Sequence, residues 1–138
     1  MSDEIEDGER QDLAEVNLRL ANMQGANLSS ADLRRANLDG ANLEQVALVG
    51  ANLERAGLIW SNLTGSAMRE ADLSRVDLEK ATLHRANLRY ASLYQASLYG
   101  ADLCGVNMRR ADLRNARFLS EAILPDGWRE ALEAAGLI

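Results

Sequence analysis

Residue types that commonly build chemical sites are scarce in this chain of 138 residues. It contains one cysteine, one histidine and one proline, and aromatic residues make up 4% of it. A single cysteine excludes an internal disulfide, and one cysteine with one histidine provides too few ligands for a closed metal site. No apolar stretch approaches the roughly 20 residues that a membrane-spanning helix needs. Disulfide-rich scaffolds and helical membrane proteins are therefore excluded.

Charge is unevenly distributed along the chain, whose net charge is −6. Residues 1–15 hold seven acidic residues and one arginine, and residues 121–138 hold four and one. Residues 16–120 hold thirteen basic and ten acidic residues, a balance of +3. The acidic start MSDEIEDGER is unlike the basic leader of a secreted protein, so we expect a cytoplasmic location. We also hypothesise that this acidic start lies over basic residues and competes with an acidic partner.

What the chain does have is a repeat of five residues. An apolar residue, usually leucine, recurs at every fifth position from Leu13 to Ile123, and a small residue, usually alanine, stands two positions before it. On an α-helix, residues five apart differ by roughly 140° around the axis, and in a flat strand an odd spacing alternates between faces. Neither element could bury this set of residues. The chain must therefore turn a corner after each short extended segment and coil around its own core.

The positions around the apolar residue favour turns. Between positions 17 and 117, the residue just before it is Asn or Asp in fourteen of twenty-one repeats, and such side chains can bond the nearby backbone. Two positions after it, six repeats have glycine, which suits a turn that requires positive φ. We expect the repeats without glycine to use another turn type.

This A(N/D)LXX pattern, as in Ala41-Asn42-Leu43-Glu44-Gln45, resembles the pentapeptide repeat family over about residues 16–124. The resemblance implies an all-β solenoid, a right-handed quadrilateral β-helix of about five coils with twenty residues in each coil. Some members of the family protect DNA gyrase with a long, acidic rod that mimics duplex DNA. Here the rod is short and its acids are scattered, so gyrase or topoisomerase protection is the alternative function rather than the first.

The two ends of the chain depart from the repeat. Residues 1–15 are predicted to form an acidic N-terminal arm and short cap, in which residues 9–15 are good helix formers and residues 1–8 are loose. Residues 16–124 form the predicted β-helix. Residues 125–138 are predicted to form a C-terminal helical cap, in which Trp128 and Leu132 cover the last coil. The alternative is a homodimer contact through this helix, so the chain is either a monomer or a homodimer.

Residues twenty apart should stack on one side of the coil, which converts the sequence into a map of the surface. Two columns of arginine result: Arg69, Arg89 and Arg109 with Arg110 beside them, and Arg35, Arg55 and Arg75. Because like charges on neighbouring strands repel, these columns either fan into solvent or bind an acidic partner. Trp60 and Tyr99 mark a third candidate surface for a protein partner, although Lys80 could cover Trp60 by a cation–π contact.

One pair of residues could support chemistry. His84 and Cys104 are twenty apart and should stack about 4.8 Å apart, where an imidazole can activate a thiol. We expect no carboxylate to orient this imidazole and do not expect Asp102 to complete a metal site, so we predict no catalytic, cofactor-binding or metal-binding residues. The sequence favours a non-enzymatic scaffold that binds a protein partner. The overall acidity argues against nucleic acid as that partner.

Overall fold

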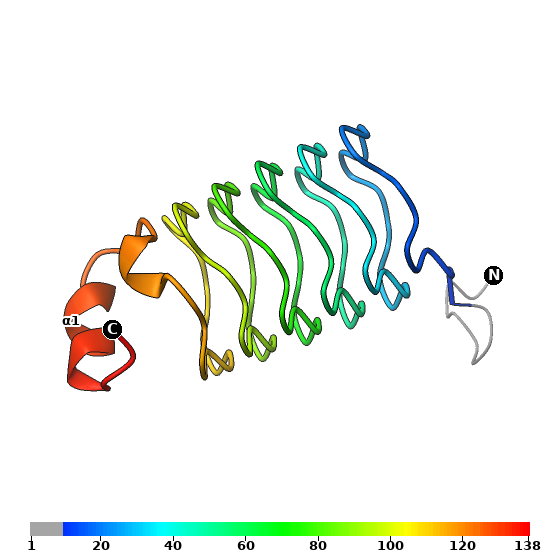
Figure 1. Cartoon of the computed structure of the whole chain (residues 1–138). Coiled ribbons are helices and arrows are strands. Elements are labelled where there is room, and N and C mark those ends of the chain that lie inside the picture. Colours follow the sequence, from blue (N-terminus) through cyan, green and yellow to red (C-terminus); the bar gives the residue numbers. More distant parts are fainter. Residues whose placement is uncertain (1–9) are drawn as a thin grey trace.

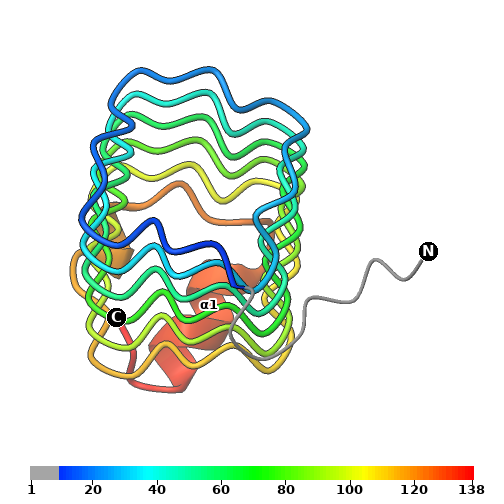
Figure 2. The same cartoon turned by 90° about the vertical axis from the view of Figure 1, so that its right-hand side faces the viewer.

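The computed structural model describes residues 10–138 of the chain, which coil into a rod with a helix at one end (Figure 1). Parallel bridges join residues twenty apart at every fifth position, from the pair Asp12–Asp32 to the pair Ser97–Arg117. Four pentapeptides therefore complete one coil, and the twenty-residue register that the family resemblance implied is confirmed. Seen from the N-terminal end, successive coils overlie one another as a four-sided outline (Figure 2). In residues 10–138 the coils pair through isolated bridges rather than extended strands.

In the inner coils, a pentapeptide with Asn or Asp before the leucine satisfies its backbone N–H groups in a fixed pattern, as residues 32–36 illustrate. Asp32 donates to the coil before it, whereas Leu33 and Arg35 donate to the coil after it, at 2.7–3.0 Å. The N–H of Ala36 closes the corner on the carbonyl of Leu33 at 3.0 Å. The fifth N–H, that of Arg34, bonds Oδ1 of Asp32 at 3.2 Å. The N–H of this position bonds neither neighbouring coil, and the Asn or Asp side chain satisfies it, which explains why these residues recur before the leucine.

The predicted hydrogen bonds between Asn or Asp side chains and the local backbone are confirmed. Gly57, the one glycine at this position, shows how another residue can supply the missing acceptor. Gly57 has no side chain to accept the N–H of Ile59, and Oδ1 of Asp39, from the preceding coil, accepts it at 3.0 Å. A Cβ added to Gly57 would lie 2.8 Å from that same Asp39 oxygen. Gly57 and Asp39 therefore form a matched pair that preserves the hydrogen bond.

At every corner, the second residue after the leucine adopts the left-handed conformation, whether or not it is glycine. The six glycines have φ of 67–69°, and fifteen other residues at the equivalent position, from Glu15 to Asn115, have φ of 55–62°. Each of these corners closes with the same bond from N–H to the carbonyl three residues earlier. The expectation of another turn type in the repeats without glycine is therefore wrong. Regular stacking of the coils overrides the intrinsic preference of these residues for negative φ.

The interior is a stack of leucine and alanine side chains. The central leucines from Leu33 to Leu98, together with Met68, have an exposed fraction of 0%, and the alanines that flank them have at most 1%. Burial of one such leucine contributes about 1.5–3 kcal/mol to stability. The two buried serines of the small-residue position, Ser61 and Ser66, lie in the same layer. The hydroxyl of Ser61 donates a hydrogen bond to the carbonyl of Leu58 at 2.8 Å.

The N-terminal end begins the coil earlier than predicted. Residues 11–15 already form the first pentapeptide, with Asp12 bridged to Asp32 and a left-handed corner at Glu15. The helical cap expected over residues 9–15 is therefore wrong for its described part, because pairing with the next coil overrides helix propensity. The predictions about residues 1–8, including their contact with basic residues, lie outside the described residues.

At the C-terminal end one extra residue shifts the register. Phe118 is 50% exposed and left-handed, while Leu119 takes the interior place at 2% exposed. The short helix η1 (Leu119–Glu121) follows, and Ile123 pairs with Asp102, twenty-one residues before it. The five-residue period therefore does not continue unbroken to Ile123, which is 53% exposed. Leucine matches the size of the other interior residues, whereas phenylalanine would overfill the same space.

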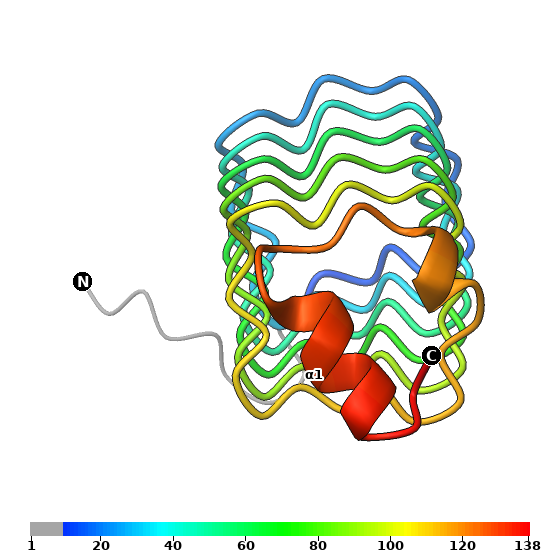
Figure 3. The same cartoon turned by 90° about the vertical axis from the view of Figure 1, so that its left-hand side faces the viewer.

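Helix α1 (Trp128–Ala134) lies across the end of the coil (Figure 3). Its start follows Gly127, which has φ of 78°. Leu132 is 4% exposed and joins the core, and Trp128 packs against the core while partly exposed. Both predicted capping residues thus pack against the core of their own chain. Neither helix in residues 10–138 has the length and apolarity that crossing a membrane would require.

Candidate functional site

The two arginine columns lie on sides of very different net charge. We call the Arg35 side the outward residues of segments 12–15, 32–35, 52–55, 72–75, 92–95 and 112–115. The Arg69 side comprises those of segments 27–30, 47–50, 67–70, 87–90 and 107–110. The Arg35 side has five arginines and six carboxylates, whereas the Arg69 side has four arginines and Glu70. Their net charges are therefore −1 and +3, although the two sides have similar numbers of arginines.

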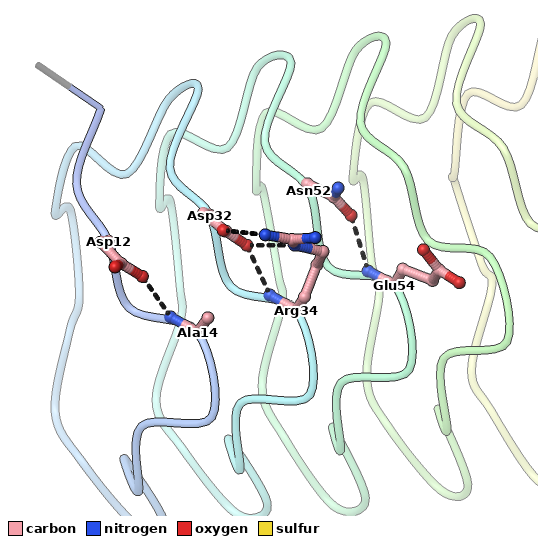
Figure 4. Close-up of polar contacts among 6 residues, drawn as sticks. All are labelled: Asp12, Ala14, Asp32, Arg34, Asn52 and Glu54. Atoms are coloured by element: carbon pink, nitrogen blue, oxygen red, sulfur yellow. Dashed lines mark hydrogen bonds and ion pairs between the residues drawn. The ribbon is translucent and has the colours of Figure 1, made fainter. Parts of the chain in front are cut away.

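On the Arg35 side, carboxylates of the same side pair with three of the five arginines, which are Arg34, Arg75 and Arg114. The guanidinium of Arg34 folds back onto Asp32 with two hydrogen bonds of 2.7 and 2.8 Å (Figure 4). These bonds from Arg34 lower the pKa of Asp32 to about 2. Arg114 makes the equivalent pair with Asp112 at 2.8 and 2.9 Å, and this pair lowers the pKa of Asp112. In such bidentate pairs, the guanidinium N–H groups that could bind an acidic partner are already bonded within the chain.

The rest of the Arg35 side is similarly balanced. Arg75 donates to Gln95 at 2.9 Å and to Glu54 at 3.3 Å. An open groove of about 350 Å³ runs over this side and is lined by Ala14, Glu15, Arg34, Arg35, Glu54 and Arg55. Because both charge signs line the groove, it has no strong preference for an anion.

On the Arg69 side, three arginines surround one aromatic ring and only one carboxylate lies near them. The guanidinium carbons of Arg69, Arg89 and Arg110 lie 5.7, 5.6 and 5.8 Å from the centre of the Tyr90 ring. The single carboxylate, Glu70, approaches Arg69 at 3.6 Å. Nε of Arg89 is buried without a hydrogen-bond partner among the described residues. The ring holds three cations together without neutralising them, so this side retains its positive charge.

The third candidate surface is divided between two contacts. Trp60 is 65% exposed, and Nζ of Lys80 lies 4.9 Å from the centre of its ring, as the cation–π alternative predicted. Tyr99 packs edge-on against Phe118, with ring centres 5.9 Å apart. This partner of Tyr99 could not be foreseen, since the register had placed Phe118 in the core. Trp60 and Tyr99 are each engaged by another residue of the chain.

His84 and Cys104 do stack, but a carboxylate lies with them. Nε2 of His84 is 2.5 Å from Oδ2 of Asp102, whose Oδ1 accepts the N–H of Cys104 at 3.1 Å. The expectation that no carboxylate orients this imidazole is therefore wrong. Side chains eighteen residues apart can meet across neighbouring coils, as Ser74 and Ser92 also do at 2.9 Å. That spacing is the signal in the sequence that could have identified Asp102.

The electrostatics of this cluster oppose a catalytic thiolate. A hydrogen bond to Asp102, assisted by partial burial, raises the pKa of the Cys104 thiol. Burial alone would raise the pKa of Asp102, but bonds from the Cys104 N–H, His84 and the Cys104 thiol together lower it. A cysteine activated for nucleophilic attack has the opposite shift, towards a lower pKa.

Comparison with known proteins shows the family. The sequence profile described as pentapeptide repeats matches eight copies, over residues 9–40, 36–79, 51–89 and 81–118. The chain therefore belongs to the pentapeptide repeat family. A search of curated proteins gave no significant match.

Solved structures with the same fold include two from cyanobacteria. The pentapeptide repeat protein Rfr23 from Cyanothece 51142 is 30% identical, with a TM-score of 0.80 over 82% of this chain and 90% of that one. HetL from Nostoc sp. strain PCC 7120, a protein involved in heterocyst differentiation regulation, is 37% identical, with a TM-score of 0.54. The match covers 84% of this chain but only 58% of HetL. The fluoroquinolone resistance protein QnrB1 is 14% identical, with a TM-score of 0.48, and carries no functional argument.

Proposed function

We propose that this chain is a non-enzymatic, rigid interaction module of the cytoplasm that binds an acidic segment of a protein partner through Arg69, Arg89, Arg109 and Arg110. The observation that supports this surface is its net charge of +3, against −1 on the neighbouring Arg35 side. Arg35, Arg55 and Arg75, predicted with equal weight from the sequence, become the weaker candidate. Trp60 and Tyr99 are secondary contacts, since each already packs against another residue.

Two features make the Arg69 side suited to an acidic protein segment. The arginines sit on a backbone fixed by inter-coil hydrogen bonds, such as those from Glu70 to Arg89 at 2.9 Å and from Tyr90 to Arg109 at 3.1 Å. Little conformational entropy of the backbone is therefore lost on binding. Guanidinium groups also bind carboxylates in a planar, two-point geometry that lysine cannot provide. The chain as a whole has a charge of −6, which disfavours nucleic acid as the partner.

The test is affinity capture from an extract of the native host with three forms of the full chain. We expect wild type to retain a partner, and Arg69→Glu/Arg89→Glu/Arg109→Glu to lose it. The matched control, Arg35→Glu/Arg55→Glu/Arg75→Glu, reverses the same number of charges on the neighbouring side and should retain the partner. Equal retention by both triple variants, each folded by circular dichroism, would contradict the proposal.

Gyrase protection is the second candidate function. It draws only on the family, and the Arg69 side argues against it, because four arginines and one glutamate occupy that side. A supercoiling assay with purified gyrase separates the two. Inhibition of supercoiling or relief of quinolone poisoning by the wild-type chain would favour this alternative.

For the oligomeric state we propose a monomer in which α1 caps the coil, because Leu132 is already buried at 4% exposed within its own chain. The alternative is a homodimer through the partly exposed Trp128. Light scattering coupled to gel filtration distinguishes them, and a dimeric mass that Trp128→Ala converts to a monomer would support the alternative.

A further inference from the structure

The only histidine and the only cysteine of the chain are brought together by the coil, and Asp102 lies between them. One potential metal-ligand atom from each of His84, Asp102 and Cys104 lies within 4.8 Å of the other two. They lie on a different side of the coil from either arginine column, in segments 82–85 and 102–105. The three side chains offer nitrogen, oxygen and sulfur, the donor types that zinc binds in proteins.

We propose that His84, Asp102 and Cys104 form a three-ligand site for Zn²⁺, with a fourth position open to water. This site is independent of the proposed interaction surface. An open position of this kind is typical of zinc sites with three protein ligands.

The ligand spacing is close to what zinc requires. Donor atoms of a tetrahedral zinc site lie about 3.3–3.7 Å apart, given metal–ligand distances of about 2.0–2.3 Å. The present separation of 2.5 Å between His84 and Asp102 must therefore open by roughly 1 Å, and the thiol must turn inward. Rotation of the side chains suffices for this change, because the side chain of His84 is 46% exposed and that of Asp102 is 25% exposed.

The backbone beneath the site is already fixed. Leu83 donates to Asp102 at 2.8 Å and Arg85 donates to Cys104 at 3.2 Å, so the two coils that supply the ligands are held in register. The N–H of Cys104 holds Oδ1 of Asp102, which leaves Oδ2 directed towards His84. Metal ligands oriented by such outer hydrogen bonds bind more tightly than free ones. Zn²⁺ takes the place of the thiol proton, which is released to solvent.

Cobalt offers a direct spectroscopic test, since a bond between Co²⁺ and thiolate produces a charge-transfer absorption band in the near ultraviolet. The full chain, free of any histidine tag and stripped of metal with a chelator, is titrated first with Co²⁺ and then with Zn²⁺ as competitor. Because the chain has one cysteine, such a band can come only from Cys104. We expect one Co²⁺ bound per chain, the thiolate band, and loss of that band as Zn²⁺ displaces the cobalt.

Three variants assign the ligands. Cys104→Ser should abolish the band, and His84→Gln and Asp102→Asn should each weaken binding by more than roughly 100-fold, since even outer-shell changes cost about 10–100-fold. Asp102→Asn keeps the oxygen that accepts the Cys104 N–H, so the corner remains intact. Asp77→Asn, the same change at the equivalent position of another side, is the matched control and should bind as wild type does. Failure of wild type to bind one Co²⁺, a complex without the thiolate band, or undiminished affinity of Cys104→Ser would each overturn the proposal.

Discussion

The Arg35 side and the Arg69 side differ in what surrounds their arginines rather than in the arginines themselves. On the first, carboxylates at the turn-forming position accept bidentate hydrogen bonds from nearby arginines, as Asp32 does from Arg34. On the second, the equivalent positions hold Asn or Ala, and the arginines gather around Tyr90. Asp and Asn satisfy the corner equally well, so the choice between them leaves the fold unchanged and sets the charge of a side. In this rod, surface charge is therefore tuned at a structural position.

The largest effect should follow reversal of the Arg69 side. Arg69→Glu/Arg89→Glu/Arg109→Glu should weaken binding of a fluorescent polyglutamate peptide by more than about tenfold at low salt, because it turns the attractive side repulsive. Fluorescence anisotropy measures this. The same reversal at Arg35, Arg55 and Arg75 should change the affinity far less, and equal losses would remove the distinction between the two sides.

A smaller gain should follow from removing carboxylates of the Arg35 side. Asp32→Asn/Asp72→Asn/Asp112→Asn changes that side from −1 to +2 while keeping each side-chain oxygen that closes a turn. Made in the chain that already has the reversed Arg69 side, it should restore polyglutamate binding by about threefold, with stronger salt dependence. Unaltered binding in a folded triple variant would show that the carboxylates do not limit how strongly the paired arginines bind the peptide.

Stability should distinguish the two tyrosines by the number of cations around them. Tyr90 has three guanidinium groups within 5.8 Å, and Tyr94 has two within 5.9 Å. An exposed cation–π contact contributes about 0.5–1 kcal/mol, so Tyr90→Leu should lower the free energy of unfolding by about 1 kcal/mol and Tyr94→Leu by less. Urea denaturation provides the values. A greater loss at Tyr94 would contradict this ranking.

The smallest effect concerns the titration of Asp32, whose pKa is about 2 against an ordinary 3.8. Because the folded pKa is lowered, the pair with Arg34 stabilises the fold above about pH 4, and this contribution is lost as the pH falls towards 2. Arg34→Ala should return the pKa towards 3.8, as followed by carboxyl NMR. The stabilities of wild type and variant should converge at low pH. A pKa that stays near 2 in the variant would assign the shift to the backbone instead.

The five-residue period was predictable because side chains repeat their chemistry, and a chain that turns a corner after each short segment follows once neither helix nor strand can bury Leu33 and its equivalents. The coil of twenty residues was implied by the resemblance to the pentapeptide repeat family. The charge difference between the sides could also be read from the sequence. The position before the leucine often holds an acid such as Asp32 on the Arg35 side and holds a neutral residue such as Asn27 on the Arg69 side. Counting only the arginines concealed it.

Three features were missed in the sequence, each for a physical reason. Residues 11–15 have helical propensity, but pairing with the next coil outweighs it. Phe118 and Leu119 are both apolar, so the pattern alone does not show which one enters the core. Asp102 meets His84 at a spacing of eighteen rather than twenty, because its side chain leans across the gap between coils.

The left-handed corners have a consequence for how the rod assembles. Each of the fifteen residues other than glycine at these corners sits in a conformation that costs about 1–2 kcal/mol in isolation. A single coil has two to four such corners and would bear their cost without any stacked leucine or inter-coil hydrogen bond to offset it. Winding must therefore nucleate on two adjacent coils formed together, after which every added turn rests on a completed template. Unwinding should likewise start from a terminal coil, where only one neighbour holds the corners in place.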